Sequence, residues 1–265
     1  MANSLLLQDG SGDLLVQDGS GSLLGQSDGG SSVIAEVGAG SQRTHVDIQN
    51  GSTVDSASIT VTSGNLMVVW GSAWKGITAV TVTDTRSTSY STILGSGLSD
   101  GAGGQYRPFL AYGIVPTSGA CVVTIAPSGD PGMWMNAVID EFSGVSASPL
   151  SVNGGSSTGT GSPMSDGITT LTAGELVVAV VGMGAGTGDF SMTPAAGWTQ
   201  VEEVESTAIA CYSAIFQVVG AAGAYTPSWT SGANRAWSVT SASFKAPTSA
   251  AVQLKSMLSL LGVGT

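Results

Sequence analysis

The feature that most restricts the fold is a strand pattern that the chain carries twice. Each copy has a Gly-containing turn, a long apolar strand, further strands and a closing strand that ends in phenylalanine, at Phe142 and at Phe244. The two halves therefore span about 56–145 and 168–246, and a Ser-, Gly- and Pro-rich linker joins them. The matching segments are 62–69 with 172–179, 112–122 with 216–226, and 129–134 with 232–237.

The composition indicates that both halves are built from β-strands. Charged residues make up 9 % of the chain and 39 of the 265 residues are glycine, whereas an ordinary soluble domain has about 25 % charged residues. Short apolar runs between Gly-rich turns are typical of all-β proteins. Runs such as 176–181 are almost continuously apolar, which suits strands covered on both faces or strands in a tight sandwich core.

We therefore expect an all-β body over residues 33–246. The favoured arrangement is one jelly-roll-like antiparallel β-sandwich to which each half supplies about half of the strands. Two tandem sandwiches are the alternative.

Residues 1–32 form an N-terminal arm with a nine-residue repeat. The phrases LLLQ, LLVQ and LLGQ alternate with Asp-Gly-Ser-Gly turns, which predicts short strands joined as hairpins. Such a small meander is marginal alone in water, and consecutive leucines place apolar groups on both of its faces. We expect the arm to bind a partner, with a disordered tail as the alternative. The proposed contacts are Leu5, Leu6, Leu7, Leu14, Leu15, Val16, Leu23 and Leu24.

A calcium-binding nonapeptide solenoid has the same period of nine residues. Its pattern requires aspartate at the places that Leu14 and Leu23 occupy in the arm. We therefore set that fold aside.

The C-terminal tail, residues 247–265, changes its periodicity. Its apolar residues fall at helical spacing and Gly262 is a suitable stop, so we expect a short amphipathic helix. A helix of this length is marginal alone and must dock on something. The proposed contacts of the tail are Leu254, Met257, Leu258 and Leu261.

The charge pattern argues against several classes of partner. The net charge is −11 and the seven basic residues are scattered, whereas nucleic-acid binding needs clustered Lys and Arg. No run of 18 apolar residues exists to span a membrane. The start lacks a basic segment followed by a long apolar core, so no secretory signal is expected and synthesis is cytoplasmic. Cys121 and Cys211 lie in apolar runs, and we expect buried free thiols rather than a disulfide.

Catalytic chemistry is not expected from these residues. The only histidine, His45, lies in a predicted strand without a triad motif, and a structural role is the simpler interpretation. The densest acids are 140–141 and 202–205. Neighbours on a strand point to opposite faces, so we interpret them as solvated faces, although a fold can assemble a glycosidase site from distant carboxylates. No metal-ligand spacing occurs, and we expect no cofactor or metal.

Aromatic residues supply the remaining candidates. Trp134 and Trp237 hold matching positions in the two halves, which predicts core packing. Trp74, Tyr90 and Trp198 lie near turns and are the candidates for stacking on sugar rings, with packing at the sandwich rim as the simpler interpretation.

The body resembles a repeated β-sandwich module of tailed-bacteriophage virion proteins and of some bacterial surface proteins. The segments that carry the resemblance are TAGELVVAVVG, PAAGWTQVEEV and the strand from Trp237 to Phe244, and the similarity covers about 56–246. The LLLQDGSG opening is also similar to the starts of phage structural proteins. No functional residue is carried over, because the likeness rests on framework positions.

The resemblance implies a non-enzymatic virion protein: a capsid decoration (cement) protein, a head fibre or a tail appendage. Its partners would be other virion proteins, either the major capsid protein or tail subunits, and other copies of itself in a homotrimer. The rival hypothesis is a tail-associated module that binds a carbohydrate or a host receptor. A secreted enzyme is a third and weaker hypothesis, because both a signal and a site are missing.

Overall fold

The structure is a computed structural model. It describes residues 33–37, 43–48, 52–99, 105–184, 191–204 and 211–247, and the backbone of residues 6–8, 14–17 and 23–26. All regular elements in these residues are strands that pair antiparallel, which confirms the predicted all-β class. The body, Val33–Ala246, is one compact unit and the arm belongs to another, so each is described by itself. The predicted C-terminal helix lies outside the described residues and stays a prediction.

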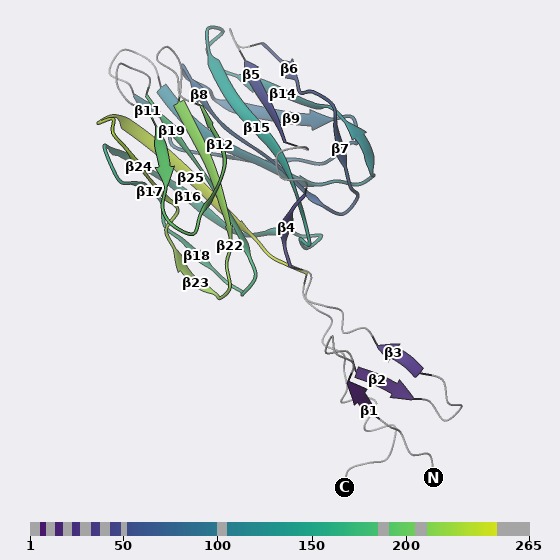
Figure 1. Cartoon of the computed structure of the whole chain (residues 1–265). Coiled ribbons are helices and arrows are strands. Elements are labelled where there is room, and N and C mark those ends of the chain that lie inside the picture. The colour runs from purple at the N-terminus through teal and green to yellow at the C-terminus, as the bar shows by residue number, and fades with distance from the viewer. Residues whose placement is uncertain are drawn as a thin grey trace. The chain divides into compact units, whose positions relative to one another are not determined.

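The first half of the body has one large sheet and two small ones (Figure 1). The strands of the large sheet are β4 (Ala35–Glu36), β5 (Thr44–Ile48), β8 (Leu66–Trp74), β10 (Ser91–Leu94), β11 (Leu98–Ser99), β12 (Gln105–Ile114) and β15 (Trp134–Ser143). Their order is β10–β12–β8–β15–β4, with β11 also on β12 and β5 also on β15. The strands of the small sheets are β6 (Val54–Asp55), β7 (Ile59–Val61), β9 (Ala79–Asp84), β13 (Gly119–Cys121) and β14 (Val123–Ser128), ordered β6–β14–β9 and β7–β13.

The second half follows the same plan. Its large sheet contains β16 (Leu150–Thr160), β19 (Leu176–Met183), β21 (Thr199–Val204), β22 (Cys211–Val218) and β25 (Ala236–Phe244), in the order β16–β25–β19–β22–β21. Its small sheets contain β17 (Met164–Ser165), β18 (Ile168–Thr170), β20 (Met192–Pro194), β23 (Gly223–Tyr225) and β24 (Ser228–Ser231), ordered β17–β24–β20 and β18–β23.

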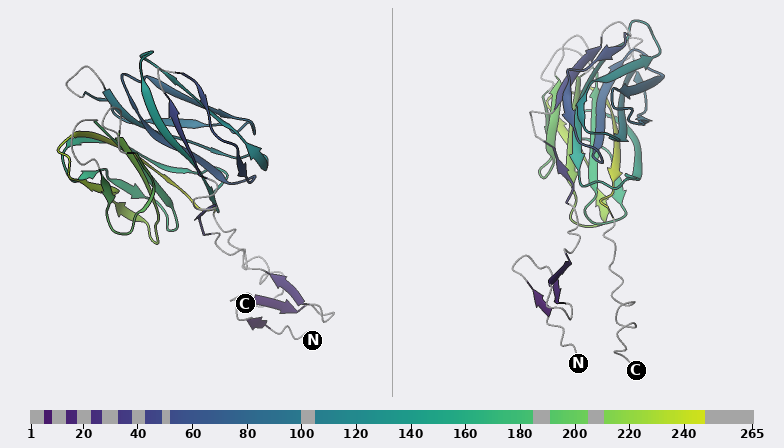
Figure 2. Two further views of the ribbon diagram at one scale, coloured as in Figure 1. Left: turned by 45° about the horizontal axis from the view of Figure 1, so that its top comes forward. Right: turned by 90° about the vertical axis from the view of Figure 1, so that its right-hand side faces the viewer.

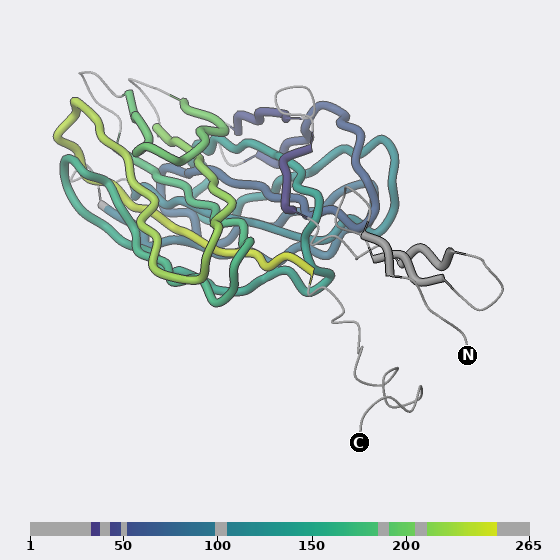
Figure 3. The backbone as a smooth tube through the Cα atoms, turned by 60° about the horizontal axis from the view of Figure 1, so that its bottom comes forward, coloured from purple at the N-terminus to yellow at the C-terminus, as the bar shows by residue number. Residues whose placement is uncertain are grey.

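The two halves share one pairing plan. In the second half, β16, β17 and β18 pair with β25, β24 and β23; in the first half, β4 and β5 both pair with β15, while β6 and β7 pair with β14 and β13. This nesting is the order of a jelly roll. Each half therefore pairs its strands within itself as a jelly-roll-like sandwich, and the two sandwiches together form the one compact unit Val33–Ala246. Figure 3 shows the two halves side by side, the first running from purple to teal and the second from teal-green to yellow.

The two sandwiches pack against each other through their large sheets, and this explains the continuous apolar strands. Along β8, Leu66, Val68 and Trp70 belong to a central cluster between the halves, whereas Met67 and Val69 belong to the core of the first sandwich. The strand β19 alternates in the same way between the central cluster and the core of the second sandwich. Both faces of each large sheet are thus covered, so an apolar residue is favoured at every position.

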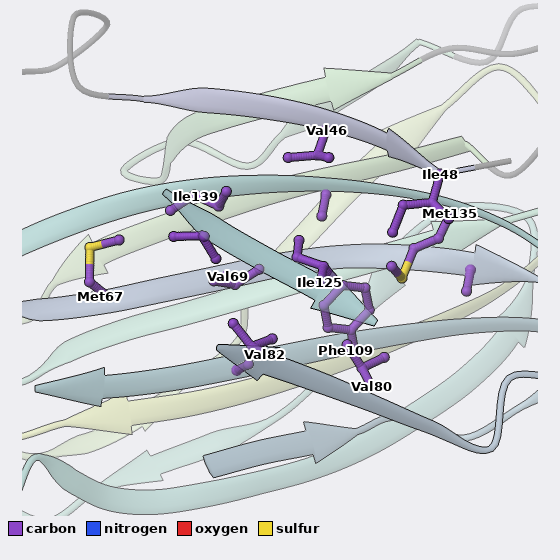
Figure 4. Packing of buried hydrophobic residues seen from close by; sticks show 14 of the residues in the cluster. Val46, Ile48, Met67, Val69, Val80, Val82, Phe109, Ile125, Met135 and Ile139 are labelled. Carbon is purple, nitrogen blue, oxygen red and sulfur yellow. The ribbon is translucent and has the colours of Figure 1, made fainter. Parts of the chain in front are cut away.

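Four layers result, with the large sheets inside and the small sheets outside (Figure 2). Figure 4 shows the core of the first sandwich, where Phe109 from β12 and Met135 from β15 lie near Val80 and Val82 from β9. Both cysteines are buried and free, as predicted. Trp237 is buried and Trp134 is half-buried. The predicted match between them is one position out, because Trp237 lies opposite Met183 whereas Trp134 lies opposite Trp74.

The N-terminal arm contains a three-stranded antiparallel meander. Its strands are β1 (Leu6–Gln8), β2 (Leu14–Gln17) and β3 (Leu23–Gln26), ordered β1–β2–β3. Gln8 pairs with Leu14 and Gln17 pairs with Leu23, so consecutive strands pair in the same register of the repeat. The antiparallel pairing expected for the three repeats is confirmed.

Candidate functional site

Several charged and polar side chains meet where the N-terminal strands of the first half contact the second half. We call this region the seam and define it by Glu36, Arg43, His45, Asp47, Asp140, Val201 and Tyr212. Its first contact is made by His45 on β5. The His45 Nε2 atom lies 2.8 Å from Asp47 Oδ1, and its Nδ1 atom lies 3.2 Å from the hydroxyl of Tyr212 on β22.

Stacking reinforces this contact between the halves. The rings of His45 and Tyr212 are nearly parallel, with centroids 6.3 Å apart. Tyr212 is fully buried, and burial raises the pKa of its hydroxyl well above the usual range. The histidine therefore gives a hydrogen-bond partner to a buried hydroxyl, which fits the structural interpretation of His45.

Arg43 makes the second contact across the seam. Its guanidinium bonds Glu36 on β4 and the backbone oxygen of Val201 on β21, and its Nε lies 3.4 Å from Asp140 Oδ2 on β15. The pKa of Asp140 is raised, first by burial and then by the neighbouring Glu36 carboxylate, while Arg43 opposes the shift. One arginine thus joins the N-terminal segment, the first half and the second half.

The acids at 140–141 correct a prediction made from the sequence. Both were interpreted as solvated, but Asp140 is 1 % exposed and Glu141 is 0 % exposed. Glu141 Oε1 accepts hydrogen bonds from the Thr62 N–H at 2.8 Å and from Asn65 Nδ2 at 2.7 Å. Neighbouring strand residues do serve opposite faces, but here both faces are covered by protein. Glu202 and Glu203 are partly buried, and Glu205 lies outside the described residues.

The seam can hold the halves together, but its geometry does not favour hydrolysis. A catalytic acid and base must reach a substrate, and the side chain of Asp140 is only 1 % exposed. In the described part of the chain, no group of three or more His, Cys, Asp or Glu side chains is placed to hold a metal.

The role of Arg43 in the seam was not predicted from the sequence. The sequence around it carries no signal for these contacts, because Asp140 and Val201 lie 97 and 158 positions away.

The three candidates for sugar stacking lie in separate places, and each is engaged locally. The Tyr90 hydroxyl donates to Asp84 Oδ2 at 2.8 Å, and burial together with that carboxylate raises the pKa of Tyr90 far above its usual value. The Lys75 ammonium lies 5.1 Å from the ring centre of Trp74. Trp198 packs against two clusters of the second half. Rim packing describes all three, and their role in glycan binding stays a prediction.

The arm candidates are placed by the strand register. Leu6, Val16 and Leu24 are paired across the three strands, and Leu7 and Leu15 are paired one step along. Leu5 lies outside the described residues, as do the tail candidates Leu254, Met257, Leu258 and Leu261. Their partner contacts stay predictions.

Comparisons with known proteins add no relative. No family model, no curated protein and no solved structure matches this chain. Among the described residues, none forms a helix with the length and apolar character that a membrane crossing would need.

Proposed function

We propose that this protein is a non-enzymatic structural component of a larger particle, held in place by its N-terminal arm. Following the sequence resemblance, the particle is a bacteriophage virion and the protein is a capsid decoration or head-fibre protein. The arm lies on the major capsid protein or on tail subunits, and the copies associate as trimers.

The register of the arm carries this proposal. Neighbouring positions of a strand belong to opposite faces of a sheet. By register, the paired positions Leu6, Val16 and Leu24 share one face with Leu14 and two glutamines, and the paired positions Leu7 and Leu15 share the other face with Leu23 and one glutamine. By residue type, both faces of the meander are therefore mainly apolar. A small sheet with two apolar faces needs protein on both sides or it aggregates, and a neighbouring subunit supplies such a surface.

Three arginines of the body argue against assembly on the phosphates of a nucleic acid. Arg86 Nε donates to the Ala120 oxygen at 2.7 Å, and Arg107 Nε donates to the Gly95 oxygen at 2.6 Å. Together with Arg43, these guanidinium groups bind their own chain. Nucleic-acid binding would require such groups to face a phosphate backbone.

Two arm variants with a matched control test the proposal. One variant lacks residues 2–26, and the second carries Leu6→Ser, Leu15→Ser and Leu24→Ser. The control carries Gln8→Ser, Gln17→Ser and Gln26→Ser, which changes equally spaced residues of the same strands. The measurement is the amount of protein that co-sediments with particles from a producing lysate.

We expect both leucine-deficient proteins to be lost from the particle fraction, while the control keeps its occupancy and all three bodies keep the melting temperature of the unchanged protein. Normal occupancy of the protein that lacks residues 2–26 would overturn the anchoring role.

A further inference from the structure

A small notch opens where the first large sheet meets the linker between the halves. Its volume is about 260 Å³. One wall comes from Ser89 and Ser91 at the start of β10, the floor from Tyr112 and Ile114 on β12, and the other wall from Ala147 and Pro149 in the linker. Tyr112 and Ile114 also pack against the central cluster, so the notch lies at the margin of the contact between the two sandwiches.

The walls are fixed by contacts outside the notch. Ser91 and Tyr112 are direct partners in the strand register. The Tyr112 ring packs on Phe244, with centroids 5.0 Å apart. Two backbone hydrogen bonds hold the linker to Lys245: Ser146 N–H donates to the Lys245 oxygen, and Lys245 N–H donates to the Pro149 oxygen, each at 2.9 Å. A site with fixed walls loses little entropy when a ligand binds.

A close backbone approach sets the position of Ser89. A Cβ atom at Gly113 would lie 2.6 Å from the backbone oxygen of Ser89, so only glycine allows the chain to run this close to β12. Gly113 therefore allows the segment with Ser89 to lie close to β12.

The notch has uncharged chemistry. None of its lining residues carries a charge. The hydroxyl groups of Ser89, Ser91 and Tyr112 have no hydrogen-bond partner among the described residues. Each hydroxyl can both donate and accept. The lining also contains Ile114, Pro149 and the aromatic residue Tyr112, so the notch offers polar and apolar groups together.

We propose that this notch binds one ring of a neutral saccharide. A sugar ring has hydroxyl groups at its rim and apolar C–H faces, which match the three free hydroxyls and the aromatic floor. Drug-sized ligands occupy pockets of about 300–1,000 Å³, so 260 Å³ suits a single ring. An acidic sugar or a phosphate would need a cationic partner, and the lining offers none. This inference goes beyond the structural role and does not depend on it.

Saturation-transfer NMR on the full chain tests the inference. The probes are the methyl glycosides of glucose, galactose and mannose, with methyl glucuronide as the charged comparison. The variants are Tyr112→Phe, which keeps the ring on Phe244, and Ser91→Ala. Ser52→Ala is the matched control, because Ser52 is exposed and does not line the notch. Thermal unfolding of each variant checks that the fold is intact.

We expect saturable binding of at least one neutral glycoside and none of the glucuronide. Loss of one hydrogen bond of about 1 kcal/mol corresponds to an affinity about fivefold weaker, so Tyr112→Phe and Ser91→Ala should each weaken binding by about that factor. Ser52→Ala should leave it unchanged. The inference is wrong if no neutral glycoside binds, if both notch variants bind as the unchanged protein does, or if the glucuronide binds equally well.

Discussion

Ser72 and Gly182 hold equivalent positions in the two halves and lie directly against each other. A Cβ atom added at Gly182 would be 2.2 Å from Ser72 Oγ and 3.0 Å from Ser72 Cβ. The two residues are 110 positions apart, which is the spacing of the internal repeat. In a two-fold arrangement, a residue meets its own equivalent only near the axis. The two sandwiches therefore pack like the subunits of a symmetric dimer, with this pair close to the pseudo-axis.

The first prediction concerns this contact. Gly182→Ser adds atoms where Ser72 leaves no room, and overpacking of this kind costs about 1–3 kcal/mol. The double variant Ser72→Gly with Gly182→Ser moves the side chain to the equivalent place in the other half, and we expect it to recover most of that loss. The free energies of unfolding of the single and double variants in urea test this expectation. Additive losses in the double variant would contradict the pseudo-symmetric packing.

At a second pair of equivalent sites, each half has one buried carboxylate, but the carboxylate comes from a different segment in each half. In the first half, Glu141 on β15 accepts from the turn before β8 and from Asn65. In the second half, Glu175 holds the position of Asn65 and Ser243 holds that of Glu141. Glu175 Oε1 accepts from the Thr172 N–H at 2.8 Å. Each half thus places one buried carboxylate under the turn that precedes its central strand.

The second prediction exchanges these partners. Glu141→Ser leaves the Thr62 N–H and the Asn65 amide without their acceptor, and each unsatisfied buried group costs about 1–3 kcal/mol. Adding Asn65→Glu recreates the arrangement of the second half and should recover most of the loss. Asn65→Glu alone places two carboxylates together and should destabilise the protein. Guanidinium unfolding gives the three values. If the double variant were no more stable than Glu141→Ser, the equivalence would be refuted.

Local patterns account for much of the fold. The duplicated turn and strand at 62–69 and 172–179 predicted two related halves, and the Asp-Gly phrases predicted the hairpins of the arm. The apolar run at 176–181 indicated two covered faces but not what covers them. That answer depends on the packing of one half on the other, which involves residues more than a hundred positions apart. Periodicity within a single strand does not encode such a contact.

The site residues were harder to predict for the same reason. The acids at 140–141 looked solvated because each was judged with its neighbours in the sequence, whereas Arg43 reaches Asp140 from 97 positions away. The notch around Tyr112 is formed by β10, β12 and the linker, and no motif joins these segments. Pairing across the fold, rather than local composition, decides which polar groups are buried.

The third prediction concerns the thiols. Cys121 and Cys211 are both 0 % exposed, and burial together with the nearby Asp84 carboxylate raises the pKa of Cys121 to about 11. Thiols react as thiolates, so neither cysteine should react with an aromatic disulfide reagent at neutral pH while the protein is folded. Absorbance of the released thiolate measures the reaction, and denaturant should expose two equivalents. Rapid stoichiometric labelling of the native protein would contradict the burial of both side chains.

The fourth prediction concerns acidic stability at Glu175. Burial by itself raises the pKa of this carboxyl, but hydrogen bonds from Ser151 and Thr172 outweigh it, so the pKa is lowered. A carboxyl with a lowered pKa in the folded state stabilises the protein above its unfolded pKa, and that contribution is lost as the pH falls. Glu175→Gln should therefore lower the melting temperature at neutral pH. In acid, the melting temperatures of the variant and of the unchanged protein should lie closer together. Melting temperatures at pH 7 and pH 3 measure this, and an equal difference at both values would contradict it.

The last prediction runs in the opposite direction at Asp140. Burial and Glu36 raise its pKa in the folded state to about 8, whereas an aspartate in an unfolded chain has a pKa of about 3.9. Between these values the folded state binds more protons than the unfolded state, so this residue makes the free energy of unfolding fall as the pH rises.

Asp140→Asn removes the titration and keeps an oxygen that can accept from the Glu141 N–H, which donates to Asp140 Oδ1 at 2.8 Å. We expect urea unfolding to show a smaller loss of stability between pH 5 and pH 8 in Asp140→Asn than in the unchanged protein. Asp55→Asn, the same substitution at an exposed site, should leave the slope unchanged. A slope in Asp140→Asn equal to that of the unchanged protein would mean that Arg43 keeps Asp140 ionised throughout this range.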